Sequence, residues 1–196
     1  MKNKQELKVY FVLASLPNYS ETFLRSLFEG LGEKKIRATV FLQQRAEGQE
    51  KFAYVNPFPI RWPALYFFFP SVITYLLLTK FSSVYSFFSA EQMNGSSLLK
   101  ILKRIYINAH IFLAPKPDWI HFGFATLAVG NENLAKALGA RLAVSIRGFD
   151  IALYPLKHKN CYQHLWARVD KLHTISDDLY DLAVQQGFPL DKPFRK

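Results

Sequence analysis

The segment between Asp118 and Pro189 constrains the fold most, because three apolar, strand-like runs within it each end in a polar cluster. The clusters are His121 with Gly123, then Arg147, Gly148 and Asp150, then Ser176 with Asp177 and Asp178. Two of the intervals between the runs have the spacing of helices. In an open α/β sheet, the loops at the carboxyl ends of parallel strands converge on one crevice. This order therefore predicts a parallel sheet with a ligand site along that edge.

The amino-terminal part shows the same alternation of strand and helix. Strands are expected over residues 8–15 and 36–43, with a helix between them from a capping box at Asn18 and Glu21 to Gly32. Further strands are expected over 119–124, 141–146 and 171–175, and further helices over 96–113, 131–138, 159–169 and from Ser176 to near Gly187. We therefore expect residues 1–196 to form one α/β domain, a Rossmann-like parallel sheet flanked by helices.

No glycine-rich turn follows the first expected strand, because Gly30 and Gly32 fall at the end of the helix. The sequence therefore disfavours NAD binding. A phosphate group can still approach the start of that helix, where free backbone N–H groups gather around Ser20, Glu21 and Thr22. An ordinary capped helix is the alternative interpretation.

Cysteine usage points to a reducing compartment. Cys161 is the one cysteine, which excludes a disulfide within the chain. The sequence also has no Cys/His spacing typical of a metal site. We therefore expect a cytoplasmic protein without a bound metal.

Positive charge and aromatic side chains are concentrated in the middle of the chain. The net charge is +10, and residues 51–117 hold seven basic side chains against one acid, Glu91. Residues 52–88 hold 13 of the 31 aromatics, which run together between Trp62 and Leu78 without interleaved cations. An apolar surface flanked by cations fits an anionic membrane interface better than a nucleic-acid groove. A transmembrane helix over this run and purely internal packing are the other two interpretations.

The helix expected over residues 96–113 carries Lys100, Lys103 and Arg104 on its polar side. Such cations usually form a solvated helix face. Here they could also meet lipid headgroups.

Two polar clusters are candidates for chemistry. His121 leaves a strand into a glycine-containing segment, so its imidazole can reach the crevice as a proton acceptor or a hydrogen-bond donor. In the next loop, Gly148 lets the backbone approach a ligand, and Arg147 and Asp150 bring opposite charges together. A structurally satisfied histidine and an ion pair that only fixes the loop are the alternatives.

Four segments resemble, in this order, the motifs of retaining glycosyltransferases of the GT-B fold, family 4. They are residues 17–23, 118–123, 144–151, and 174–179 with 187–189. Members of that family share a Ser-Glu-Thr-Phe loop after the first strand, a histidine after a later strand and a His-Gly-aromatic-Asp loop after the next. This chain has Arg147 where that histidine is common, which keeps a donor suited to phosphate or sugar hydroxyls.

The resemblance implies transfer of a sugar, with retention, from a nucleotide-sugar to a lipid-linked or polysaccharide acceptor. It implies that His121 hydrogen-bonds the transferred sugar and that Asp150 shapes the acceptor side with Arg147. The candidate catalytic residues are therefore His121 and Asp150. The candidate substrate-binding residues are Ser20, Glu21, Thr22, Gly123, Arg147, Gly148 and Ser176. Neither a cofactor nor a metal is expected, because the nucleotide-sugar is a substrate.

Enzymes of that family contain two Rossmann-like domains with the active site between them. This chain resembles the amino-terminal, acceptor-side half and ends where the second, donor-binding domain should begin. We therefore expect residues 1–196 to be inactive alone, and the protein to act in polysaccharide biosynthesis, peripherally on the inner face of the cell membrane. The alternative is a non-catalytic membrane-surface or carbohydrate-binding module; a nucleic-acid-binding domain rests on charge alone.

Overall fold

The described residues form a seven-stranded sheet in which every pairing is parallel. The structure is a computed structural model that describes residues 6–17, 26–28, 30–31, 34, 36–47, 50 and 52–196. The strand order is β3-β2-β1-β4-β5-β6-β7. The strands are β1 Leu7–Leu13, β2 Ile36–Leu42, β3 Tyr54–Val55, β4 Trp119–Phe122, β5 Arg141–Ser145, β6 Lys171–His173 and β7 Phe194–Arg195. The expected fold class, a Rossmann-like parallel sheet flanked by helices, is confirmed.

The central strands are buried on both faces, as strands of parallel sheets usually are. In β1, Tyr10 and Val12 enter the larger apolar cluster, while Phe11 and Leu13 enter a smaller cluster on the other side of the sheet. The alternation follows from the two-residue period of a strand. β1 pairs with β2 and with β4, which places it near the middle of the sheet.

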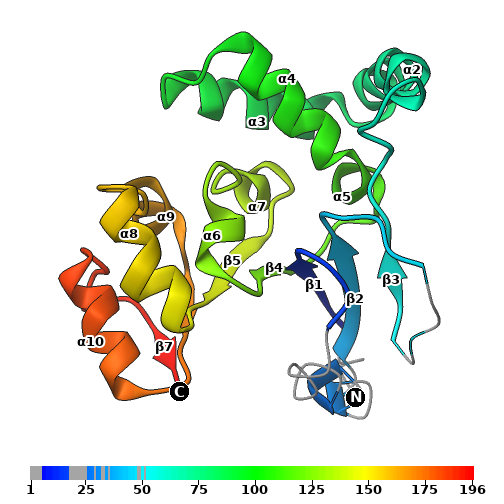
Figure 1. Cartoon of the computed structure of the whole chain (residues 1–196). Helices are drawn as coiled ribbons and strands as arrows, with labels where there is room; N and C mark the ends of the chain where they lie inside the picture. The colour runs from blue at the N-terminus through cyan, green and yellow to red at the C-terminus, as the bar shows by residue number, and fades with distance from the viewer. Residues whose placement is uncertain are drawn as a thin grey trace, which may run out of the picture.

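Helices form two layers over the face that carries the larger cluster (Figure 1). The described helices are α2 Ala64–Thr79, α3 Phe81–Met93, α4 Leu98–Ile107, α5 Ala109–Leu113, α6 Ala125–Ala128, α7 Leu134–Ala137, the π-helical turn η2 Phe149–Leu153, α8 Tyr154–Lys157, α9 Gln163–Arg168 and α10 Asp177–Gln185. In Figure 1, α2, α3 and α4 lie at the top of the view, above α5, α6 and α7. We call these three helices, which follow β3 and precede α5, the outer helical layer.

Most expected elements are present with shifted ends. The helix expected over 131–138 is the short α7, and the one expected over 159–169 is reduced to α9. The helix expected over 96–113 breaks at Asn108, whose side-chain amide donates to the Arg104 carbonyl at 2.9 Å and to Asn131 Oδ1 at 2.8 Å. The helix expected from Asn18 lies largely outside the described residues.

A buried carboxylate joins the outer helical layer to the layer below. Glu91 on α3 is 1% exposed and forms an ion pair with Arg104 on α4. Its carboxylate also accepts hydrogen bonds from Ser96 Oγ at 3.1 Å and from Asn133 Nδ2, at the start of α7, at 2.9 Å. On the helix face that was expected to be solvated, Lys100 and Lys103 are exposed, whereas the Arg104 guanidinium turns to the buried Glu91 charge, which requires a partner.

We predict that Glu91→Ala lowers the free energy of unfolding by about 3 kcal/mol, because it leaves the Arg104 charge and the Asn133 amide without their acceptor. Urea denaturation followed by circular dichroism measures the change. The neighbouring Gln92 is exposed, and Gln92→Ala should change stability by less than about 0.5 kcal/mol. Equal losses in the two variants would contradict the role assigned to Glu91.

Candidate functional site

The polar strand ends lie together along the carboxyl edge of the sheet. β4, β5 and β6 are neighbours, and their parallel register pairs His121 with Ala143 and Ser145 with His173. The loops that leave these strand ends contain Gly123, Gly148 and Ser176. The prediction that three polar strand ends share one rim is therefore confirmed.

Two imidazole rings are linked through one hydroxyl on this edge. Ser145 Oγ lies 2.8 Å from His121 Nε2 and 3.1 Å from His173 Nδ1. The hydroxyl has one proton, so it can donate to one ring while it accepts from the N–H of the other. The His121 ring also stacks on Phe11, with the centroids 5.1 Å apart. These contacts fix the orientation of the His121 ring.

Sequence reasoning found His121 but missed Ser145 and His173. The sequence carried no direct signal for this pair. Ser145 and His173 end β5 and β6, and only the register between these strands brings them onto one face.

Both imidazoles are held in the neutral form at neutral pH. Burial, reinforced by His173, Arg147 and Lys171, lowers the pKa of His121 to about 3. Burial also lowers the pKa of His173, with further contributions from Arg147, Lys171 and Arg195. The two rings therefore act as hydrogen-bonding groups rather than as cations.

The Asp150 carboxylate lies beneath the rim and holds two loops together. It is 1% exposed and accepts hydrogen bonds from the backbone N–H groups of Arg147 at 2.6 Å and Ala125 at 3.1 Å. Tyr162 donates its hydroxyl to the Asp150 carbonyl. Burial raises the pKa of Asp150, although these N–H groups oppose that shift. Asp150 thus ties the loop after β5 to the start of α6.

The other predicted residues of these loops play different structural parts. The guanidinium of Arg147 lies over the Phe124 ring, 4.5 Å from its centroid. A Cβ atom on Gly123 would come within 2.4 Å of Leu13 Cδ2, so a larger residue there would displace the tip of the Leu13 side chain. A Cβ atom on Gly148 would meet nothing within 4 Å, which leaves the backbone open to approach.

Ser176 caps α10, as its position before two acids predicted. Its Oγ accepts a hydrogen bond from the Leu179 N–H at 3.3 Å. Ser20, Glu21 and Thr22 lie outside the described residues, and their approach to a phosphate stays a prediction.

A pocket of about 350 Å³ lies on the face of the sheet that carries the histidines. It spans β1, β4, β5, β6 and β7, and its polar lining consists of His121, His173, Lys171 and Arg195. In the part of the chain that the structure describes, no three His, Cys, Asp or Glu side chains are placed to share a metal ion. The polar groups of this pocket suit an anionic or hydroxyl-rich ligand.

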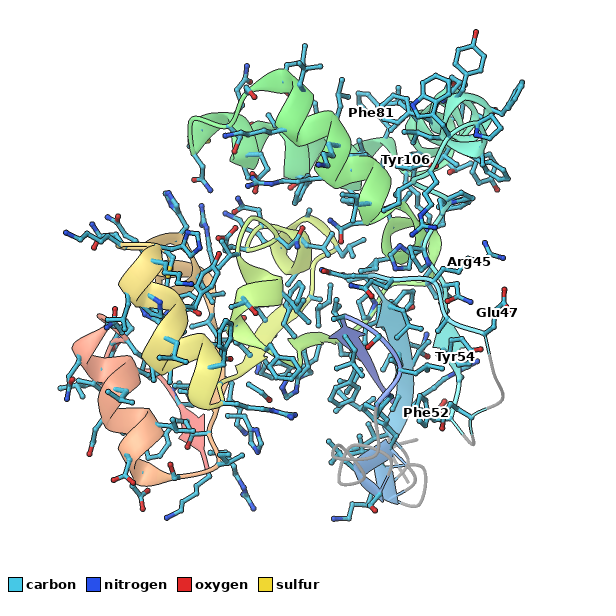
Figure 2. The ribbon with its side chains drawn as sticks, viewed as in Figure 1. Arg45, Glu47, Phe52, Tyr54, Phe81 and Tyr106 are labelled. Atoms are coloured by element: carbon cyan, nitrogen blue, oxygen red, sulfur yellow. The ribbon has the colours of Figure 1, made fainter. Side chains whose placement is uncertain are left out.

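A second hollow, of about 700 Å³, opens beyond the carboxyl end of β2, and we call it the β2 hollow. Its lining includes Gln43, Arg45, Phe58, Arg61 and Trp62. Figure 2 shows Arg45 beside the upper end of β2. Because β2 is parallel to β1, the β2 hollow belongs to the same edge of the sheet as His121. Sequence reasoning missed it, since residues 43–61 carry no motif.

Comparison with known proteins finds likeness in structure and none in sequence families. No protein-family model and no curated protein match the chain. The lipopolysaccharide outer core galactosyltransferase WaaB, in its apo form, is 12% identical with a TM-score of 0.50, over 97% of this chain and 45% of the WaaB chain. A sucrose-phosphate synthase from Thermosynechococcus elongatus is 9% identical with a TM-score of 0.48, over 96% of this chain and 86% of that one. At such identities the likeness shows the fold alone, a Rossmann-like domain of the kind that WaaB contains.

Proposed function

We propose that this chain is the acceptor-side domain of a retaining GT-B glycosyltransferase, which transfers a sugar from a nucleotide-sugar to a lipid-linked or polysaccharide acceptor. The observation that carries the proposal is the fixed, neutral His121 imidazole at the carboxyl edge of a parallel sheet. The fold shared with WaaB, a galactosyltransferase by name, supports the same reaction class.

His121 has the role of a hydrogen-bond partner for the transferred sugar. A neutral imidazole presents one N–H donor and one acceptor, and His121 is bound to Ser145 through Nε2. The other ring nitrogen, Nδ1, is the group assigned to a sugar hydroxyl. Ser145 and His173 are positioning residues, since they act through the His121 ring.

Transfer breaks the bond between the anomeric carbon and the leaving phosphate oxygen and forms a bond from that carbon to the acceptor oxygen. The acceptor proton leaves with the diphosphate. Hydrogen-bond donors and cations that stabilise the negative diphosphate lower the barrier. Arg147 supplies one cation beside the rim, and the second domain of a complete enzyme supplies the remaining contacts to the nucleotide.

The test compares two proteins in a transfer assay with nucleotide-sugars and glycan or lipid-linked acceptors. Purified residues 1–196 should give no detectable transfer. The protein encoded by the full reading frame should transfer the sugar with its anomeric configuration retained. Transfer by residues 1–196 alone would refute the assignment to one half of a two-domain enzyme. A reading frame without a second Rossmann-like domain would favour the non-catalytic carbohydrate-binding module.

We predict that His121→Ala in the full-length enzyme lowers kcat/KM about 30-fold, because it removes a hydrogen bond to the reacting sugar worth about 2 kcal/mol. Ser145→Ala should lower kcat/KM less, since it only loosens the ring. His164 on α9 is exposed, and His164→Ala is the matched control that should leave kcat/KM unchanged. An unchanged kcat/KM for His121→Ala would return this residue to a structural role.

A second prediction concerns pH. The unfolded chain protonates His121 near its ordinary pKa of 6.5, whereas the folded chain resists protonation down to about pH 3. The free energy of unfolding should therefore fall as pH drops below about 6.5, by up to about 1.4 kcal/mol per pH unit for this group. His121→Gln should flatten that decline in urea titrations from about pH 7 to about pH 5. Parallel profiles for wild type and variant would contradict the pKa shift.

A third prediction separates positioning from chemistry at Asp150. Asp150→Ala leaves the buried N–H groups of Arg147 and Ala125 without an acceptor, so it should lower the free energy of unfolding by about 2 kcal/mol or more. Asp150→Asn keeps one acceptor oxygen and should lose less. Denaturant titrations measure both. Undiminished stability of Asp150→Ala, together with lost transfer, would instead assign Asp150 to the reaction.

A further inference from the structure

Helix α2 of the outer helical layer carries apolar side chains on both sides. The inward side chains of α2, which pack into the core cluster, are Leu65, Phe69, Val72, Ile73 and Leu76. The outward ones, which are exposed, are Tyr66, Phe67, Tyr75, Leu77 and Leu78. No charged residue occurs in this helix. A helix that is apolar all round normally has a partner on every side, yet the described residues cover only one side of α2.

The exposed apolar surface continues from α2 onto α3 and α4. Phe67 is 66% exposed, Leu78 79% and Phe81, which Figure 2 labels on this layer, 60%. An apolar groove of about 180 Å³ runs between the three helices and is lined by Leu77, Phe81 and Tyr85 among others. We call the exposed side chains of α2 and α3, with Trp62 and with Leu98 and Leu99 of α4, the docking face. Contiguous exposed apolar surface of this kind marks an interaction site.

Cations surround the docking face without exposed acids among them. Arg61, Lys100 and Lys103 are exposed, and Lys80 at the α2–α3 corner is half-buried. Between residues 61 and 107 the one acid is Glu91, which is buried against Arg104. A partner for this face therefore needs an apolar centre and a negative rim.

The geometry of α2 and α3 limits how these helices can contact a lipid bilayer. Within the described residues, no single helix is long and apolar enough to cross a bilayer, and α2 with α3 reaches that length only as a pair bent by 108°. Trp62 just before α2, Tyr66 on α2 and Tyr85 on α3 are exposed, and Trp and Tyr rings favour the headgroup level of a membrane.

We propose that the docking face lies flat on an anionic bilayer surface, with its aromatic side chains among the headgroups and upper acyl chains and its cations on the lipid phosphates. Charge selects this occupant over a second copy of the chain. A two-fold dimer through this face would bring the same cations against each other, whereas anionic lipid complements them. This inference does not depend on the sugar-transfer proposal.

Vesicle co-sedimentation of the purified chain tests the proposal. Binding should be at least tenfold stronger to phosphatidylcholine vesicles that contain phosphatidylglycerol than to phosphatidylcholine alone, and it should weaken as salt is raised. Alkaline carbonate should release the bound protein. Equal binding to both vesicles, insensitivity to salt or resistance to carbonate would overturn peripheral docking on anionic lipid.

Matched variants locate the bound surface. Phe67→Ser, Leu78→Ser and Phe81→Ser combined should lower vesicle binding at least tenfold, because these exposed side chains insert into the lipid. The control combines Leu153→Ser, Leu156→Ser and Leu190→Ser, whose side chains are 55%, 74% and 74% exposed elsewhere. It should bind as wild type does. Equal loss in both triple variants would show nonspecific adsorption and refute the docking face.

A second pair of variants tests the contribution of the cations to vesicle binding. Lys100→Gln with Lys103→Gln should weaken binding to anionic vesicles about fivefold per lysine at low salt. Lys157→Gln with Lys159→Gln removes two exposed lysines from the α8 region and should change binding little. Sedimentation equilibrium tests the alternative occupant. If wild type forms a dimer that the Phe67, Leu78 and Phe81 variant loses, and wild type does not bind vesicles, the partner of the docking face is a second copy of the chain.

Discussion

All neighbouring strands in the described sheet pair in parallel, and the other features follow from this constraint. Each connection must run back over a face of the sheet to the edge where the next strand begins. Short crossovers after β4, β5 and β6 supply the helices on one face. The crossover from β3 to β4 is much longer and contains α2, α3, α4 and α5. It both covers the sheet and builds the outer helical layer. The same parallel order brings His121, Ser145 and His173 to one edge.

The longer strands were predictable because each is an apolar run, and β1, β2, β4, β5 and β6 lie within two residues of their expected ends. The two-residue strands β3 and β7 were not predicted, since each is too short to form a pattern of its own. The cap at Ser176 was predictable because its signal is local. The His121–Ser145–His173 chain was missed because it depends on register between strands far apart in sequence. The direction of the Arg104 side chain was misjudged for a similar reason, since its partner Glu91 lies on another helix.

Buried carboxylates organise this structure from inside. Glu91 joins α3, α4 and α7, and Asp150 joins the loop after β5 to the start of α6. Each is about 1% exposed and is satisfied by hydrogen-bond donors, as buried charges require. Glu91 is the one acid between residues 61 and 107, so its burial leaves no exposed acid in that segment. The exposed cations of the segment therefore lack a nearby acid from it, which gives this side of the molecule a positive potential.

The β2 hollow has Arg61 and Trp62 in its lining, and the same two residues belong to the rim and the apolar part of the proposed lipid-facing surface. One wall of the hollow would thus stand at the level of the headgroups. A lipid-linked acceptor held in the bilayer would then reach the sheet edge by lateral diffusion, without leaving the membrane. Its search for the site would be confined to two dimensions, and its effective concentration would be set by its density in the leaflet rather than by its solubility in water.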